Sequence, residues 1–322
     1  MSKNLLVKAD IQKIGYYKDS LEVKSAILMT NSRVKIFTVL AIGTTVVFWA
    51  SAFVGIRYSL QDYSPQHLAI FRYFIASLVL ASITLIKPIR IPLIDDLPRI
   101  LLIGFLGIAA YNIVLNYGEL SVTAGAASFI VNSGPMITTI LSIRLLGERV
   151  NRTGVISMLI AFFGIGLIAI GEGAALQFKT GTFLILLAAI LQSFYFVLQK
   201  PLLERYNPFE IVSYAIWSGT FFMLILSNGI IDTIRTASVP GTLSVIYMGI
   251  FPGALGYFSW SYVLSKMQVS KASYYLYIIP VVAIAISYFW LSEVPSWISL
   301  IGGMITLSGV IALNIRGKNR IA

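Results

Sequence analysis

The side chains that could bind a ligand in this sequence are amides and aromatic rings placed inside long apolar segments. Asn112 and Asn116 lie four residues apart, so they share one face of a helix. Asn132 lies three residues before Pro135, and a proline lacks the backbone N–H that would bond the carbonyl of Val131. Polar groups inside a membrane are costly unless they meet a partner or water. Their position beside a broken helix therefore predicts a binding site for a polar small molecule.

The same arrangement recurs in the second half of the chain, 145 residues later. Pro280 then stands at the position of Pro135, and Tyr277 stands at that of Asn132. Trp49 lies near the middle of an apolar segment, whereas membrane tryptophans favour the interfaces. The candidate substrate-binding residues are Trp49, Asn112, Asn116, Asn132, Gln192, Tyr257 and Tyr277. The alternative role of the amides is to bond neighbouring helices, at roughly 1 kcal/mol each, and that of Trp49 is ordinary packing.

Charged side chains are few within the apolar segments. Arg72 and Arg57 could attract an anionic group, although we favour a structural role for both, such as bonding a helix-end carbonyl or a lipid head group. Glu148 and Glu293 end helices at equivalent positions and are expected to cap or tie neighbouring helices. No acid lies near the middle of any span. This favours facilitated diffusion or exchange, or proton coupling through a helix-end group such as Glu119.

Composition excludes several classes of protein. Hydrophobic residues make up 57% of the 322 residues and charged residues 11%, against roughly 25% charged residues in a soluble domain. Cysteine is absent and His67 is the single histidine, so we expect no disulfide, no metal site and no cofactor. No glycine-rich phosphate-binding loop occurs in the sequence. Lys and Arg residues gathered in the loops of one membrane face explain the net charge of +11. We therefore expect no nucleic-acid partner.

Apolar runs long enough to cross a hydrocarbon core of about 30 Å occur ten times. They cover residues 36–60, 67–87, 97–117, 123–144, 153–171, 181–200, 209–230, 240–264, 272–291 and 297–315. With a cytoplasmic N-terminus, the cytoplasmic side holds 20 Lys and Arg residues, and the outer side holds only Lys179 and Arg235. This imbalance predicts that both termini are cytoplasmic.

The ten spans form an internal repeat of five. An offset of 145 pairs Gly164 with Gly309, and an offset of 143 pairs residues 63–65 with residues 206–208. Because five is odd, the second unit enters the membrane inverted, a recurrent plan of secondary transporters whose substrate site lies near the midplane. We therefore predict an all-α polytopic membrane protein: ten transmembrane helices as two inverted five-helix repeats around a central cavity. The predicted regions are a basic cytoplasmic segment at 1–35, repeats at 36–171 and 181–315, and a basic cytoplasmic tail at 316–322.

The spans also carry a family pattern. The matching segments are residues 48–55, Pro65 with residues 68–73, Pro135 with residues 146–149, Gly154 and Gly164, then Pro280, residues 291–293, Gly302, Gly303 and Gly309. Together they resemble the EamA-type branch of the drug/metabolite transporter superfamily, whose members carry two copies of a five-helix unit. The resemblance implies a bacterial inner-membrane carrier, often an exporter of amino acids, with a cavity walled by helices one, three, four, six, eight and nine. The long basic head and Ser292, where glycine is common, depart from the pattern.

These features predict a secondary transporter that moves a small neutral or zwitterionic metabolite by alternating access. The resemblance implies an amino acid or related compound, moved outward. The alternative is an anionic substrate, such as a nucleotide sugar or sugar phosphate, which would require more cavity cations than Arg57 and Arg72. A remote alternative is a membrane-embedded enzyme on a lipid-linked substrate, which would need an acid/base pair or metal ligands. Expected partners are the substrate and the lipid bilayer, and monomer and homodimer are not distinguished.

Overall fold

The computed structural model describes residues 34–121, 124–171, 180–291 and 294–317. It divides into two compact units, Met1–Ala41 and Ile42–Ala322. In the first unit the described residues, 34–41, are helical and begin the Val34–Ser59 helix. Most of the predicted basic head and the end of the predicted tail lie outside the described residues. The architecture that follows is that of the second unit.

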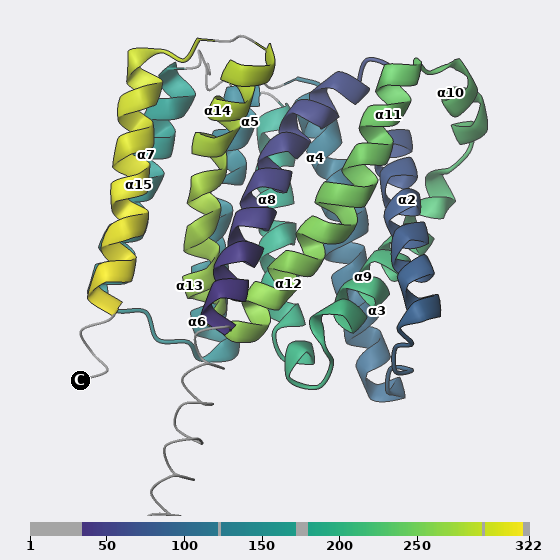
Figure 1. The fold of residues 1–322 in the computed structure, drawn as a ribbon, viewed down its shortest axis with the longest axis horizontal. Coiled ribbons are helices and arrows are strands. Elements are labelled where there is room, and N and C mark those ends of the chain that lie inside the picture. The colour runs from purple at the N-terminus through teal and green to yellow at the C-terminus, as the bar shows by residue number, and fades with distance from the viewer. Residues whose placement is uncertain (1–33, 122–123, 172–179, 292–293, 318–322) are drawn as a thin grey trace, which may run out of the picture. The chain divides into compact units, whose positions relative to one another are not determined.

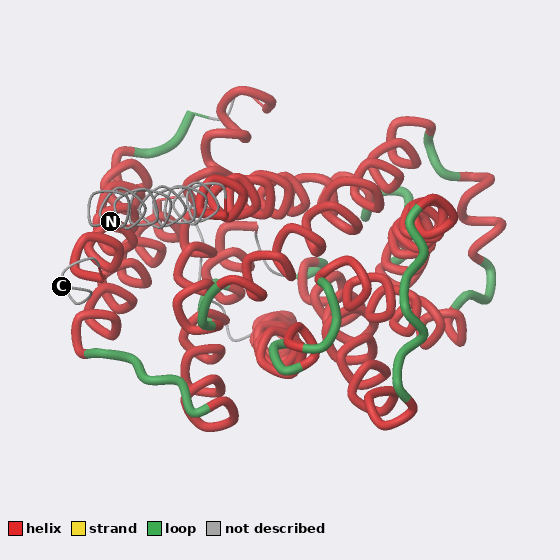
Figure 2. The backbone as a smooth tube through the Cα atoms, turned by 60° about the horizontal axis from the view of Figure 1, so that its bottom comes forward, coloured by secondary structure: helices red, strands yellow, loops and turns green. Residues whose placement is uncertain are grey.

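Every described element of the second unit is helical, and loops join successive helices (Figure 2). The first half contains the rest of the Val34–Ser59 helix, α2 (Pro65–Ile86), η1 (Ile94–Asp96), α3 (Leu97–Gly104), η2 (Phe105–Ala110), α4 (Tyr111–Glu119), α5 (Ala124–Val131), α6 (Gly134–Leu146) and α7 (Arg152–Gly171). The second half contains α8 (Thr180–Gln199), η3 (Leu202–Glu204), α9 (Pro208–Met223), η4 (Leu224–Leu226), α10 (Ile230–Thr236), α11 (Val239–Met248), η5 (Gly249–Gly256), α12 (Tyr257–Lys266), α13 (Val269–Ser273), η6 (Tyr274–Ile278), α14 (Ile279–Leu291) and α15 (Trp297–Gly317).

Within the described residues, nine helical stretches are long and apolar enough to cross a membrane. The described apolar part of the tenth, Trp297–Ala312, is shorter. The all-α polytopic fold predicted from the sequence is confirmed, and α15 stands where the tenth span is expected.

Equivalent helices of the two halves begin in the same way. Both α2 and α9 have a proline at the start of the helix, where its missing N–H costs nothing. Ser64 caps α2 through the backbone N–H of His67, and Asn207 caps α9 through that of Glu210. The 143-residue offset therefore relates residues that have the same role at the start of their helices, and not only residues of similar type.

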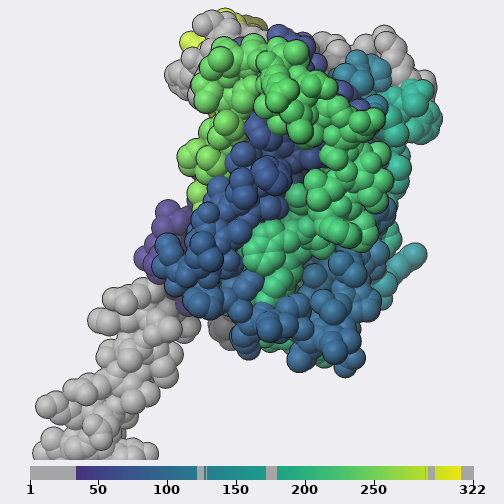
Figure 3. All heavy atoms as spheres, turned by 90° about the vertical axis from the view of Figure 1, so that its right-hand side faces the viewer, coloured from purple at the N-terminus to yellow at the C-terminus, as the bar shows by residue number. Residues whose placement is uncertain are grey.

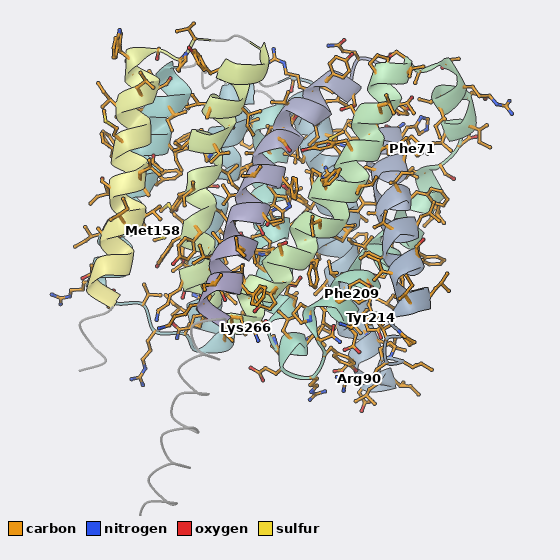
Figure 4. All side chains as sticks on the ribbon, viewed as in Figure 1. Phe71, Arg90, Met158, Phe209, Tyr214 and Lys266 are labelled. Carbon is orange, nitrogen blue, oxygen red and sulfur yellow. The ribbon has the colours of Figure 1, made fainter. Side chains whose placement is uncertain are left out.

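The two halves run in opposite directions through the bundle (Figure 1). The helix α15 ends at one face, here called the C-face, and α10 lies at the opposite face. In the first half α5 lies near the opposite face and α6 nearer the C-face, whereas in the second half α13 lies at the C-face and α14 beyond it. Arg90 and Lys266 lie at the C-face (Figure 4).

Glycines allow the closest helix contacts. A Cβ on Gly164 of α7 would collide with Thr306 Oγ1 and would lie 2.6 Å from the carbonyl oxygen of Gly302 on α15. A Cβ on Gly309 would lie 2.7 Å from the carbonyl oxygen of Ser157 on α7. Small residues permit this approach of two backbones, which is a common way to hold helices together in a membrane. On another side of the bundle, α2 packs against η5 and α11 (Figure 3).

Candidate functional site

The third span of each repeat is interrupted by a π-helical segment. η2 covers Phe105–Ala110 in the first repeat, and η5 covers Gly249–Gly256 in the second. An offset of 145 residues places the first segment within the second. Wide helical turns of this kind are frequent at functional sites because they leave carbonyls outside the regular bonding pattern.

The fourth span of each repeat is broken as well, at equivalent residues. In the first repeat α5 ends at Val131 and α6 begins at Gly134. The break predicted at Pro135 is therefore a non-helical turn at residues 132–133, just before the proline. The carbonyl of Ile130 accepts from the N–H of Ser133 at 3.0 Å and from its Oγ at 2.7 Å. In the second repeat the tight helix η6 (Tyr274–Ile278) occupies this place, and α14 begins at Ile279.

A cavity lies where these interrupted spans meet. Its volume is about 50 Å³, room for roughly four waters. The lining residues are Trp49, Ala52, Phe53, Ile56, Arg72, Tyr111, Asn112, Leu115, Val131, Asn132, Gly134, Pro135, Gln192, Phe196, Tyr257, Leu276 and Ile279.

Arg72 is the charged side chain in this lining. It is 5% exposed, and its Nε donates to the carbonyl of Met248 at 3.3 Å while its Nη1 donates to Asn112 Oδ1 at 3.5 Å. Its guanidinium also lies 5.2 Å from the ring centre of Tyr73. Neither of the two ion pairs among the described residues involves Arg72. A guanidinium carries five N–H donors, so the cavity wall holds a buried cation with donors to spare.

Aromatic rings form another part of the wall. Trp49 stacks on Phe196 with ring centres 6.0 Å apart and an interplanar angle of 5°. Tyr257 meets Trp49 edge-on at 5.2 Å. Behind them Trp260 lies 4.9 Å from Phe196. Such ring contacts hold side chains in fixed positions and present an apolar surface to a ligand.

The wall residues also bond the interrupted spans. Tyr257 donates its hydroxyl to the carbonyl of Gly107 in η2 at 3.4 Å. Trp49 donates its indole N–H to the carbonyl of Pro252 in η5 at 3.3 Å. Gly107 and Pro252 are related by the 145-residue offset, so the carbonyl at the same position of each repeat accepts from a ring of the other repeat.

Of the seven predicted substrate-binding residues, five line the cavity: Trp49, Asn112, Asn132, Gln192 and Tyr257. Pro135 and Arg72 line it too, although a structural role was favoured for Arg72. The amide of Asn112 combines both expected roles, because its Oδ1 also accepts from Arg72 Nη1 of the neighbouring helix α2 at 3.5 Å.

Four of the singled-out residues lie outside the lining. Asn116 donates to the carbonyl of Pro65 at 3.0 Å and so ties α4 to α2. Tyr277 is fully buried in a separate cluster with Tyr274 and Met158. The reason is η6: a 3₁₀-helix has three residues per turn, which turns Tyr277 away from the direction that an α-helix would give it, and Leu276 lines the cavity instead. The other two are Arg57, which is exposed, and Pro280, which is buried.

The sequence analysis did not single out the apolar half of the wall. Phe53 and Phe196 are related by the 143-residue offset, and Val131 and Leu276 by the 145-residue offset. Apolar repeat pairs carry little information by themselves, because apolar residues match easily between membrane helices. Tyr111 was missed as well, and no pattern in the sequence marks it.

Glu148 connects the two repeats at the C-face. Its carboxylate accepts from the backbone N–H groups of Val269 and Ser270 at 2.7 and 2.9 Å, and from Ser270 Oγ at 2.5 Å. Lys200 donates to two carbonyls at the end of α12 at 2.5 and 3.0 Å. An anion thus meets the start of α13 and a cation meets the end of α12, the favourable arrangement for helix dipoles. Glu293, its predicted counterpart, lies outside the described residues.

Glu119, named above as a candidate for proton coupling, ends α4 beyond the cavity. Its Oε1 is buried and has no hydrogen-bond partner in the described part of the chain. The charges of Arg72 and Arg57 both act on its carboxylate. The acid is therefore influenced by a cavity arginine and by an exposed arginine.

The sequence profile of the EamA-like transporter family matches this chain twice, over residues 36–170 and 179–315. The chain belongs to this family. It is 40% identical over 275 residues to the uncharacterized transporter YdfC of Bacillus subtilis (strain 168), covering 85% of this chain and 90% of that one. The family membership predicted from the sequence is confirmed.

Two further relatives have names that mention a substrate. A probable terminal-alkyne amino-acid exporter of Streptantibioticus cattleyicolor is 37% identical over 280 residues, covering 87% of this chain and 94% of that one. A probable amino-acid metabolite efflux pump of Escherichia coli (strain K12) is 25% identical over 283 residues, covering 84% and 92%.

A known crystal structure has the same fold. It aligns with a TM-score of 0.72 at 16% sequence identity and covers 88% of this chain and 98% of its own. The two profile matches place the chain among transporters, and the alignment confirms its fold.

Proposed function

We propose that this transporter exports a small zwitterionic metabolite, an amino acid or a close relative, across the cytoplasmic membrane by alternating access. The observation that carries the proposal is Arg72, a buried cation in the cavity wall with no ion-pair partner among the described residues. A buried charge needs compensation, and a carboxylate matches the fork of a guanidinium in two parallel hydrogen bonds. Glu119 acts on Arg72 electrostatically without forming an ion pair with it, and a substrate carboxylate supplies the direct partner.

The rest of the wall favours a substrate whose side chain has both polar and apolar parts. Asn112, Asn132 and Gln192 offer amide groups, and Trp49 and Phe196 offer apolar ring surface. The names of the two relatives that mention amino acids support the same substrate class. The single arginine is a weak match for a phosphate ester, whose two negative charges favour several cations.

Alternating access is supported by the two opposed repeats and by the cavity that residues of both repeats line. The C-face carries Arg90 and Lys266 (Figure 4) and is the end to which the loop charges gather. We therefore place the C-face in the cytoplasm, in accordance with the rule that positive loops stay inside.

The test is uptake into proteoliposomes that contain the purified full chain. The panel pairs amino acids with their amides, which lack the carboxylate, and adds a sugar phosphate. We expect transport of an amino acid, weak or no transport of its amide, and loss of transport in Arg72→Ala. Arg57→Ala is the matched control, because Arg57 is exposed and lies outside the cavity lining.

Equal transport of an amino acid and its amide would overturn the assignment of a carboxylate to Arg72. Transport of the sugar phosphate alone would overturn the zwitterionic substrate. In each case the folded state of Arg72→Ala is checked by its thermal unfolding in detergent, so that a lost fold is not read as a lost site.

A further inference from the structure

The two repeats contribute unequally to the cavity. The second repeat supplies five lining residues, and each of them is the offset partner of a lining residue in the first repeat: Trp49 with Gln192, Phe53 with Phe196, Asn112 with Tyr257, Val131 with Leu276, and Gly134 with Ile279. The seven remaining lining residues all belong to the first repeat. The cavity is therefore symmetric at its centre and extended on one side only.

Three of these seven residues extend the cavity toward the face opposite the C-face. Ala52 and Ile56 lie three and seven residues beyond Trp49, toward the end of the Val34–Ser59 helix. Leu115 lies beyond Asn112, toward the end of α4. In an inverted repeat the equivalent residues of the second half lie on the other side of the centre, toward the C-face.

Those equivalent residues are closed off in the described conformation. The partner of Ala52 is Tyr195, that of Ile56 is Gln199, and that of Leu115 is Trp260. Their exposed fractions are 0%, 0% and 1%. The Tyr195 hydroxyl, Gln199 Nε2 and Trp260 Nε1 are all buried, and none of these atoms has a hydrogen-bond partner in the described part of the chain.

The three side chains lie in one neighbourhood. Tyr195 and Gln199 are one turn apart on α8, and Gln199 Oε1 accepts from Ser261 Oγ on α12 at 2.9 Å. Trp260 also belongs to α12. Buried donors without acceptors destabilise the conformation that buries them. The Tyr195 hydroxyl interacts with Ser261 and Gln199 only beyond good hydrogen-bond geometry, so these unmet donors favour a conformation that opens this region to a polar ligand.

We propose that Tyr195, Gln199 and Trp260 form a second substrate-binding surface, which is exposed when the cavity opens toward the C-face. The inference rests on the alternating access of the proposed function. An amide N–H₂, an indole N–H and a phenolic O–H are hydrogen-bond donors without charge. They suit an acceptor group such as the carboxylate of a substrate on its way to or from Arg72.

The contacts of Glu148 and Lys200 hold this side shut. Both side chains form hydrogen bonds with the segment that joins α12 and α13. Glu148 does so from the end of α6, and Lys200 does so from the end of α8. Gln199 immediately precedes Lys200. Loss of the Glu148 contacts is therefore expected to favour opening toward the C-face.

The chain contains no cysteine. Labelling of a single introduced cysteine therefore measures the accessibility of that position alone, because no native thiol reacts. The experiment measures the labelling rates of Gln199→Cys and Ile56→Cys by a small membrane-impermeant methanethiosulfonate reagent, added to either face of vesicles. Each variant is compared with and without Glu148→Ala. We expect Gln199→Cys to be labelled from the C-face and Ile56→Cys from the opposite face.

In the Glu148→Ala background we expect labelling of Gln199→Cys to rise by about tenfold or more, because the variant removes three charge-assisted hydrogen bonds and a tenfold change corresponds to about one. Labelling of Ile56→Cys is expected to fall. Absence of Gln199→Cys labelling in both backgrounds, or a change of both rates in one direction, overturns the inference. Opposite changes without transport of any zwitterion leave it standing and reject the proposed substrate.

A second pair of variants guards against misfolding of Gln199→Cys. Trp260→Phe keeps an aromatic ring and removes the donor, and Trp217→Phe makes the same change on α9, outside the cavity lining. We expect Trp260→Phe to raise the KM for substrate presented at the C-face. An unchanged KM for Trp260→Phe counts against the inference.

Discussion

The two repeats share one backbone plan and differ in chemistry. A π-helical segment interrupts the third span of each repeat, and the fourth span is broken at equivalent residues, Gly134 and Ile279. The charge differs: Arg72 lines the cavity, while its 143-offset partner Ala215 is fully buried. The comparison teaches that symmetry sets where the cavity lies and that departures from symmetry set what it binds.

The same contrast separates structural from functional positions. Where offset partners do the same mechanical work, as the glycines of α7 and α15 do, equal substitutions are expected to have equal effects. Where the partners differ in chemistry or direction, the effects are expected to be unequal. Three predictions follow this contrast from the largest effect to the smallest.

Gly164→Ala and Gly309→Ala are each expected to lower the free energy of unfolding by about 1–3 kcal/mol, the usual cost of overpacking. The added Cβ would lie 2.6 Å from the carbonyl oxygen of Gly302 in the first case and 2.7 Å from that of Ser157 in the second. Thermal unfolding in detergent measures both. A large loss for one variant and none for the other would break the mechanical equivalence of the repeats. Gly303→Ala is the control, because a Cβ there meets its nearest atom at 3.8 Å.

Asn116→Ala is expected to lower the free energy of unfolding by about 0.5–1.5 kcal/mol, because it removes the hydrogen bond to the carbonyl of Pro65. Transport by the folded fraction stays unchanged. Asn112→Ala is expected to raise the KM, because Asn112 lines the cavity and bonds Arg72. Parallel unfolding and uptake measurements on the two variants separate the effects. If Asn116→Ala raises the KM as much as Asn112→Ala, the two amides act on the substrate together.

Asn132→Ala is expected to weaken substrate affinity by a few-fold, since one net hydrogen bond contributes about 1 kcal/mol. Tyr277→Phe is expected to leave transport unchanged, because the buried hydroxyl that it removes has no partner among the described residues. Uptake kinetics of the two variants measure this difference. A larger loss in Tyr277→Phe than in Asn132→Ala would show that Tyr277 turns into the cavity during transport.

The sequence was sufficient to predict the helical class, the repeat and five candidate residues that lie in the cavity wall, because lipid imposes strong rules on a chain that crosses it. Apolar length predicts a span, loop charge predicts its direction, and a proline within a span predicts a break. Polar groups inside a span are costly, which marks Asn112 and Asn132. The repeat then marks Tyr257 as the partner of Asn112. The π-helical segments could not be predicted in the same way. Pro252 marks one of them, but η2 contains no proline.

Side-chain direction was the other limit. An α-helical register directs Tyr277 toward the cavity, and the five residues of η6 change that register. Arg72 was interpretable either as a lipid or carbonyl contact or as a ligand group, because the sequence does not show what surrounds it. The structure shows both a carbonyl partner, on Met248, and a place in the cavity wall.

The most direct test of a substrate site between the repeats is protection of Ala52→Cys, whose parent residue lines the cavity, in this cysteine-free chain. The measurement is the rate of thiol labelling with and without a compound that the native chain transports. The account predicts that the transported compound slows labelling and that its non-transported amide does not. A transported compound that leaves the rate unchanged at saturating concentration would contradict it.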